Sequence, residues 1–208
     1  MKLKLVIVNI EANSQILSSP ERFCSEERLL RAAGIADPEK RLQSYAAELA
    51  LSYALSGDKL LKPSYAYAEN GRPVLEGGFI SLAHTKGFAA AAVFPAPVGV
   101  DVETPRSVSP HIARRVLCPA EEAFFKKTGN GLYLLEKFVL KEAFLKMTGE
   151  GLGGGFRELY DTHGLVFRNG IRAGFVTEAG VDGLILRAVT ADMPDETETI
   201  ILERSLGR

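Results

Sequence analysis

Hydrophobic and polar positions divide the chain into a series of strands and helices. Residues 2–10 (KLKLVIVNI) predict a strand, because their apolar positions alternate and then run together. Apolar positions at helical spacing predict helices over 19–34, 38–57 and 131–148, the last stopped by Gly149. Short strands are expected near 65–68, 79–84, 88–94 and 98–103, shorter helices near 109–116 and 119–128, and further strands across 164–203.

The order of these elements is similar in two parts of the chain. Strand, helices and a hairpin occur once before residues 95–98 and strand, helices and strands occur again after them. Alternating strands and long amphipathic helices of this kind are typical of an α+β fold. The pattern therefore predicts two related α+β halves that divide near residue 97.

The strand segment VGVDVE, residues 98–103, carries two acids. Successive strand side chains alternate between faces, so Asp101 and Glu103 share one face, and Val100 and Val102 share the other. Two carboxylates roughly 7 Å apart along a strand repel each other unless water or a cation lies between them. The simpler interpretation is a strand that runs into solvent with both acids hydrated.

Glu142, on the helix predicted over 131–148, lies among leucine, valine and phenylalanine when the helix is projected at 100° per residue. We expect it to be partly buried, and burying an unpaired carboxylate costs several kcal/mol. Lys146, four residues later, is the simpler partner. A divalent cation shared with Asp101 and Glu103 would also satisfy it. Oxygen ligands without a nearby Cys or His pair favour Mg²⁺.

Composition narrows the classes of protein. The 208 residues are 46% hydrophobic and carry a net charge of −1, which is typical of a soluble globular protein and gives no basis for a nucleic-acid partner. The first apolar run, residues 5–8, is too short for a signal peptide or a membrane span, so we expect a cytoplasmic protein with no membrane partner. Cys24 and Cys118 are expected to be free thiols.

A phosphate-bearing ligand would need cationic or hydrogen-bonding groups, and residues 70–94 offer several. Arg72 precedes the predicted hairpin, and His84, Thr85 and Lys86 lie near its tip. A single histidine is more often structural or on the surface, and a single arginine is even less specific. These residues therefore indicate a phosphate-binding site only in combination with the carboxylates.

Four segments stand in a distinctive order and spacing: GRP (71–73), SLAHT (81–85), VGVDVE (98–103) and FVLKEAFLKMTGEGL (138–152). A fifth, HIARRVLCPAEEAFF (111–125), lies between the last two. Gly-x-Asp-x-Glu followed about 40 residues later by Lys-Glu-Ala-x-x-Lys is a specific combination. Together these segments resemble the 4'-phosphopantetheinyl transferases, in their larger, surfactin-synthetase-activating type.

The resemblance implies an enzyme that transfers 4'-phosphopantetheine from coenzyme A to a serine of an apo acyl or peptidyl carrier protein. The products would be the holo-carrier and 3',5'-ADP, with Mg²⁺ as cofactor. The implied fold is a pseudo-dimer of two similar α/β halves, each with a small, largely antiparallel sheet packed against a long helix. Residues 1–97 would contact the nucleotide, and residues 98–208 would supply the Mg²⁺ carboxylates and the catalytic helix. We expect a monomer.

The resemblance also implies a role for individual residues. Asp101, Glu103 and Glu142 would hold Mg²⁺ against the pyrophosphate. Glu142, directly or through a water, is the candidate base for the serine, and Lys146 would contact phosphate or protonate the departing 3',5'-ADP. The residues implied in coenzyme A binding are Arg41, Arg72, His84, Thr85, Lys141 and Lys146.

Two positions depart from the family pattern. Phe138 replaces a usual tryptophan, and Ala83 stands where a serine usually precedes the histidine, which would remove one hydrogen bond to phosphate. Two other functions stay open. One is a non-catalytic protein of the same fold that binds coenzyme A or a carrier, and the other is a Mg²⁺-dependent phosphohydrolase that acts on coenzyme A.

Overall fold

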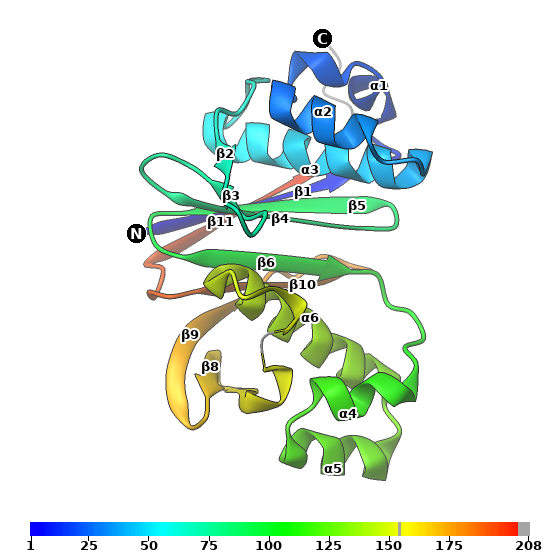
Figure 1. The fold of residues 1–208 in the computed structure, drawn as a ribbon, viewed down its shortest axis with the longest axis vertical. Coiled ribbons are helices and arrows are strands. Elements are labelled where there is room, and N and C mark those ends of the chain that lie inside the picture. The colour runs from blue at the N-terminus through cyan, green and yellow to red at the C-terminus, as the bar shows by residue number, and fades with distance from the viewer. Residues whose placement is uncertain (154, 204–208) are drawn as a thin grey trace.

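Two sheets pack face to face, and helices cover the outer face of each (Figure 1). The computed structural model describes residues 1–153 and 155–203. The first sheet has the order β11 (Glu196–Leu202), β1 (Lys2–Asn9), β5 (Phe88–Phe94) and β4 (Phe79–Thr85). The second has the order β6 (Val98–Glu103), β10 (Ile185–Thr190), β9 (Ile171–Glu178), β8 (Leu165–Arg168) and β7 (Leu159–Thr162). The arrangement is an α+β fold.

The helices lie in two groups on opposite sides of the paired sheets (Figure 1). The first group is α1 (Ser14–Leu17), α2 (Glu26–Ala33) and α3 (Pro38–Ser56). The second group is α4 (Ala113–Val116), α5 (Pro119–Thr128) and α6 (Gly131–Thr148). Short 3₁₀ turns are η1 (Pro20–Arg22), η2 (Pro110–Ile112), η3 (Gly151–Gly153) and η4 (Phe156–Glu158), and β2 (Ala66–Tyr67) pairs with β3 (Pro73–Val74). Within the described chain, no helix combines the length and apolar character needed to cross a membrane.

Helix α3 covers the first sheet and has clear end signals in the sequence. The Asp37 side chain accepts a hydrogen bond from the Glu39 amide at 2.9 Å, and Pro38 occupies the first turn. Gly57, with φ of 85°, ends the helix. Small alanines on the helix pack over the alanine-rich middle of β5, which lets helix and sheet approach closely. The predicted helix over 38–57 is confirmed.

The core between the sheets explains why β6 presents its acids to α6. Val98, Val100 and Val102 lie fully buried against β1 and β10 in this core. Because strand side chains alternate, Asp101 and Glu103 face away from the first sheet. The predicted separation of valines and acids on opposite faces is therefore confirmed.

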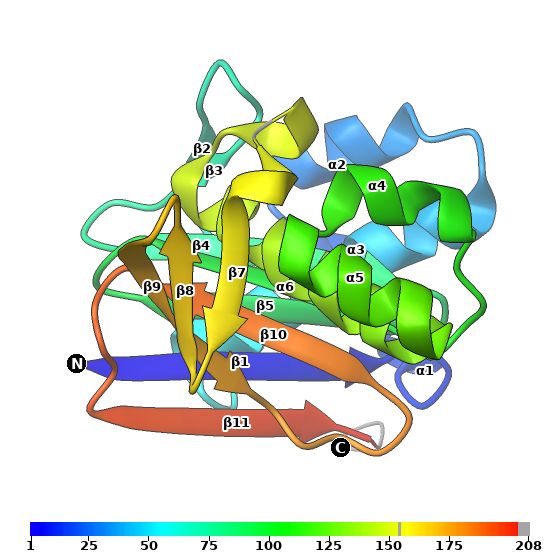
Figure 2. The same cartoon turned by 90° about the horizontal axis from the view of Figure 1, so that it is seen from below.

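Helix α6 lies directly against the backbone of β6. A Cβ atom added to Gly99 would lie 1.9 Å from the Ala143 carbonyl oxygen and 2.5 Å from the Met147 amide nitrogen, so only glycine allows this approach. The Asn130 side chain caps the first turn by accepting from the Tyr133 amide. On its other sides α6 packs against α4, α5 and the curled end of the second sheet, as Figure 2 shows. The prediction of a helix that is apolar on two sides is confirmed.

The N-terminal helix prediction was wrong in extent. Residues 19–34 form η1, then a non-helical step at Phe23 and Cys24, then α2. Ser25 caps α2, because its hydroxyl oxygen accepts a hydrogen bond from the Arg28 amide, and the buried Phe23 and Cys24 hold the preceding residues out of the helix. Both cysteines are buried free thiols, as predicted.

The last strand returns to the first sheet. The chain changes sheets between β5 and β6, across residues 95–97. Strands β6 to β10 all belong to the second sheet, and β11 returns to the first, where it pairs in parallel with β1. Each sheet is largely antiparallel and carries a long helix, as predicted. A pseudo-dimer with a division at residue 97 stays a prediction, and its residues 204–208 lie outside the described chain.

Candidate active site

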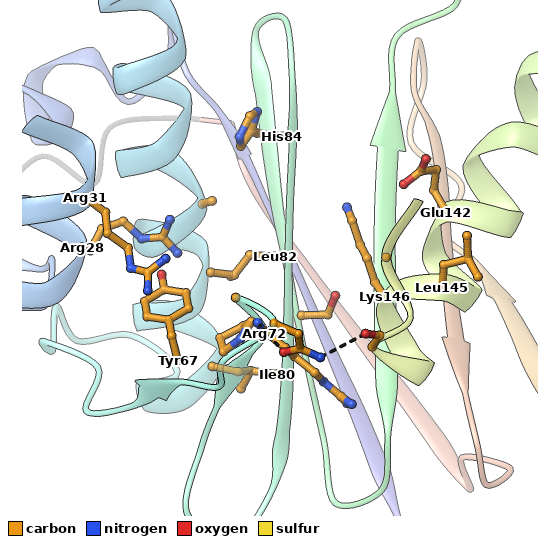
Figure 3. A pocket seen from close by; sticks show the side chains of 17 residues that line it. Arg28, Arg31, Tyr67, Arg72, Ile80, Leu82, His84, Glu142, Leu145 and Lys146 are labelled. Carbon is orange, nitrogen blue, oxygen red and sulfur yellow. Dashed lines mark hydrogen bonds between the residues drawn. The ribbon is translucent and has the colours of Figure 1, made fainter. Parts of the chain in front are cut away.

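A cavity of about 550 Å³ lies between the two groups of helices, at the edge formed by β4 and α6 (Figure 3). Arg28, Arg31 and Tyr67 stand on one side of it, and Glu142 and Lys146 stand on the other. Of the predicted site residues, four line this cavity: Arg72, His84, Glu142 and Lys146. The tertiary structure thus brings together residues that lie up to 123 positions apart, from Arg28 to Gly151.

Glu142 is a buried carboxylate with an unsatisfied oxygen. The residue is 9% exposed, and its Oε1 atom has no hydrogen-bond partner in residues 1–153 and 155–203. Burial raises the pKa of Glu142 to about 7, and the nearby Asp101 carboxylate raises it further, although Lys146 acts in the opposite direction. At neutral pH this group can therefore hold a proton, release one or bind a cation.

Asp101 is neutralised by Lys146. The Lys146 Nζ atom donates to Asp101 Oδ1 at 2.7 Å and to the Val100 carbonyl at 3.1 Å. Burial raises the pKa of Asp101, and the Lys146 ammonium partly offsets that rise. The simpler sequence interpretation paired Lys146 with Glu142, but the close approach of α6 to β6 directs Lys146 to the strand instead.

Glu103 is held by two neighbours. Thr85 Oγ1 donates to its Oε2 atom at 2.8 Å, and the Arg106 guanidinium donates to its Oε1 atom at 2.9 Å. Thr85, the last residue of β4, is buried on the strand face opposite to His84, and its hydroxyl orients Glu103, the last residue of β6. Thr85 does not line the cavity, and its predicted contact with coenzyme A stays a prediction.

The site fits a hard cation in its chemistry. Among the described residues, no three His, Cys, Asp or Glu side chains are grouped closely enough to hold a metal ion. The donor set nevertheless consists of carboxylates, which Mg²⁺ prefers. Asp101 and Glu142 face each other closely enough to raise the pKa of Glu142, and the Glu142 Oε1 atom still lacks a partner within the described chain. A cation would reduce the repulsion between the two carboxylates and would give the Glu142 Oε1 atom a partner.

Arg72 and His84 face the cavity with donors to spare. The Arg72 Nη2 atom is buried and has no partner among the residues that the structure describes, and burial lowers the pKa of this guanidinium. His84 extends from β4 into the cavity. Burial, and then the charges of Lys146 and Arg28, lower the pKa of His84, so the ring is neutral at pH 7 and donates through one nitrogen.

Two arginines of α2 were missed by the sequence analysis. Arg28 donates to the wholly buried Glu48 at 3.1 Å, which fixes α2 against α3. Arg31 stacks on the Tyr67 ring, with its guanidinium carbon 3.5 Å from the ring centre. The signal was present in SEERLLR, where arginines three residues apart share one helix face.

Two predicted coenzyme A contacts lie elsewhere. Lys141 is fully buried, and its Nζ atom donates to Glu121 Oε2 at 2.5 Å and to the Val116 carbonyl at 2.9 Å. It points to α4 and α5, because adjacent helix residues are turned by 100° and Glu142 already faces the cavity. Arg41 donates to the Ile35 carbonyl at 2.8 and 3.1 Å. Neither side chain lines the cavity, and the predicted contacts of both with coenzyme A stay predictions.

The two departures from the family pattern have local explanations. Phe138 stacks in parallel on Phe156, with ring centres 6.1 Å apart, so position 138 serves aromatic packing. Ala83 is 3% exposed and lies in the core between the sheets. Its side chain faces the side of β4 that His84 does not, so residue 83 contributes packing rather than a hydrogen bond in the cavity.

Two comparisons with known proteins each found a match to part of the chain. A sequence model described as the 4'-phosphopantetheinyl transferase superfamily matches residues 97–171, a segment that runs from β6 through α6 to the start of β9. No curated protein sequence matches the chain. Among the solved structures, the chain is similar to a holo-(acyl-carrier-protein) synthase from Bacillus anthracis str. Ames in complex with CoA (3',5'-ADP). The identity is 20%, over 44% of this chain and 91% of that one, with a TM-score of 0.34.

Proposed function

We propose that this protein is a Mg²⁺-dependent 4'-phosphopantetheinyl transferase. It moves phosphopantetheine from coenzyme A to a serine hydroxyl of an apo acyl or peptidyl carrier protein and releases 3',5'-ADP. One observation carries the proposal: the buried Glu142 carboxylate faces a cavity whose opposite wall is basic. The superfamily match supports it, because residues 97–171 include Asp101, Glu103, Glu142 and Lys146.

The cavity suits the nucleotide end of coenzyme A. Its basic side chains can contact the phosphates, and Arg72 has a buried donor that lacks a partner within the described residues. Tyr67, Ile80 and Leu82 supply flat or apolar surface for the adenine ring. The proposed orientation therefore places the 3'-phosphate and adenosine between α2 and β4, with the pyrophosphate beside α6.

In the proposed mechanism, Asp101, Glu103 and Glu142 would hold Mg²⁺, which supplies charge neutralisation and orientation of the pyrophosphate. The serine oxygen forms a bond to the phosphorus that carries pantetheine, and the bond from that phosphorus to the 3',5'-ADP oxygen breaks. Glu142, directly or through a water, accepts the serine proton. Lys146 lies beside these groups and neutralises charge on the departing phosphate.

The same reasoning leads to a finer assignment. Residues of α2 and β4 form one wall of the cavity and residues of α6 form the other, so a single chain supplies both walls. We therefore assign the protein to the larger, surfactin-synthetase-activating type, acting as a monomeric pseudo-dimer. The carrier would approach from the side of α4 and α6.

Intact-mass spectrometry tests the proposal. Apo-carriers of fatty-acid, polyketide and peptide synthesis are incubated with the protein, coenzyme A and Mg²⁺, and at least one is expected to gain the mass of phosphopantetheine. Asp101→Ala and Glu142→Ala should abolish the gain, as should excess chelator, whereas Lys86→Ala at the hairpin tip should not. Release of 3',5'-ADP without carrier modification would indicate a phosphohydrolase, and binding without any product would indicate a binding protein.

A further inference from the structure

The contact between Lys146 and Asp101 has a consequence for cation binding. Asp101 is only 9% exposed, so its negative charge needs a close partner. Lys146 is that partner, through a 2.7 Å hydrogen bond that is supplemented by the Val100 carbonyl. The ammonium therefore stands where the proposed function requires a metal ion to share Asp101.

Two cations cannot share this carboxylate without repulsion. In a partly buried site, like charges a few ångströms apart interact far more strongly than they do in water. A divalent ion that binds Asp101 and Glu142 must displace the Lys146 ammonium to use the Asp101 Oδ1 atom. Lys146 thus lowers the affinity of this site for free metal.

The Lys146 side chain can also turn toward the cavity. Its side chain is 32% exposed and lines the cavity, together with His84 of β4 and with Arg72, which lies beside Gly149 at the end of α6. Lysine has a flexible four-carbon stem and a point charge that follows the nearest anion. A phosphate group in the cavity would compete with Asp101 for the ammonium.

We propose that Lys146 and a divalent cation compete for Asp101, and that a phosphate group in the cavity draws Lys146 away and so admits the cation. The inference rests on the proposed function for the identity of the phosphate ligand, coenzyme A. Because coupling is reciprocal, the cation and coenzyme A each strengthen the binding of the other. The site therefore discriminates against free metal and assembles only when substrate is present.

Binding of Mn²⁺, followed by the electron paramagnetic resonance signal of the free ion, tests this competition without any transfer reaction. Lys146→Gln is expected to bind Mn²⁺ about ten-fold more tightly than the unaltered protein in the absence of coenzyme A. Coenzyme A should tighten Mn²⁺ binding to the unaltered protein by at least the same factor, and to Lys146→Gln by clearly less.

Lys137→Gln is the matched control. Lys137 is also on α6 and donates to an aspartate on a strand, Asp161 on β7, at 2.5 Å, but it lies away from the cavity. This substitution removes the same formal charge and should leave Mn²⁺ binding unchanged. If Lys137→Gln tightens Mn²⁺ binding as much as Lys146→Gln does, net charge explains the effect and the proposal is wrong.

Loss of the ion pair could destabilise Lys146→Gln, so melting curves accompany the binding data. Lys146→Met, which keeps the aliphatic stem, is the second variant. Mn²⁺ should raise the Tm of both variants more than that of the unaltered protein. Equal Tm shifts, or Mn²⁺ affinities that the Lys146 variants do not improve, would overturn the competition. Failure to modify any carrier would instead count against the proposed function, since neither measurement depends on transfer.

Discussion

Single residues set the chemistry of this site through burial. Glu142 and Asp101 are acids that the fold removes from water, and both have a raised pKa for that reason. Glu103 keeps two hydrogen-bond partners, Thr85 and Arg106. The three carboxylates therefore differ in their partners. Asp101 is paired with a lysine, Glu103 is held by a neutral and a cationic donor, and Glu142 can still accept a proton or a cation.

Glu142→Gln should stabilise the metal-free protein at alkaline pH. The pKa of Glu142 is about 7 in the folded protein and about 4.5 in the unfolded chain, so the folded state binds this proton more tightly. The stability that this difference contributes is complete below about pH 4.5 and is lost as the pH rises through 7. Glutamine does not titrate and avoids this loss. We expect a Tm higher by about 3–8 °C at pH 8 in chelator, and little gain at pH 4.5, in thermal melts followed by circular dichroism.

Glu136→Gln, on a partly exposed position of the same helix, is the control and should shift the Tm little at either pH. A Glu142→Gln protein that melts below the unaltered one at pH 8 would mean that the carboxylate is stabilised by an interaction other than those described above.

At the scale of elements, the site depends on how closely α6 approaches β6. Glu142 and Lys146 lie on consecutive turns of α6, and Asp101 lies on β6. Gly99 brings the two backbones into contact, since any side chain there would occupy the space of the Ala143 carbonyl. The glycine of VGVDVE is thus a positioning residue for the carboxylates that follow it.

Gly99→Ala should therefore separate α6 from β6 and impair both stability and catalysis. Overpacking of a core typically costs about 1–3 kcal/mol, which corresponds to a Tm lower by several degrees in a protein of this size. Transfer activity should fall strongly even at temperatures at which the variant is folded. Melting curves and carrier modification by mass spectrometry measure the two effects.

Gly131→Ala, at the first residue of α6, is the matched control. A Cβ atom there meets no other atom within 4 Å, and alanine favours helix, so stability should be unchanged or slightly higher. Unaltered stability and activity of Gly99→Ala would show that the helix tolerates a shift and that its close approach is not required.

At the scale of the whole molecule, the distribution of surface charge bears on the proposed carrier. The net charge is −1, so attraction of an acidic carrier needs a local basic surface. Arg114 and Arg115 are exposed on α4, and the Arg115 charge acts on Glu142. Helix α4 therefore lies on the same side of the molecule as the proposed catalytic residues, where a carrier serine would have to enter.

Arg114→Glu should raise the KM for the carrier several-fold and flatten its dependence on salt, with the KM for coenzyme A unchanged. Charges at the rim of an interface act mainly on association, and salt screens them. Steady-state kinetics at low and at moderate ionic strength measure both constants. Arg22→Glu, on η1 in the other half, should leave both unchanged. An unaltered carrier KM for Arg114→Glu at low salt would place the docking surface elsewhere.

Local periodicity along the chain was enough to predict several features of the fold. Alternation on β6 separated Asp101 and Glu103 from the valines, and helical spacing indicated that Glu142 is buried. The bounds of α3 and α6 followed from caps and glycines. These features are predictable because the side-chain directions of a strand or helix repeat with a fixed period. The helix over 19–34 failed because a second cap, Ser25, competes with the Ser-Pro signal.

Which charged groups come into contact could not be predicted from periodicity. Lys146 binds Asp101 rather than Glu142, and Lys141 turns away to Glu121. Arg28 and Arg31 reach the cavity from a helix more than 100 residues earlier in the chain than Glu142. The parallel pairing of β11 with β1 is equally non-local. Contacts of this kind depend on how closely two backbones approach and on which desolvated charge is nearest, and neither quantity is encoded in the period of a single element.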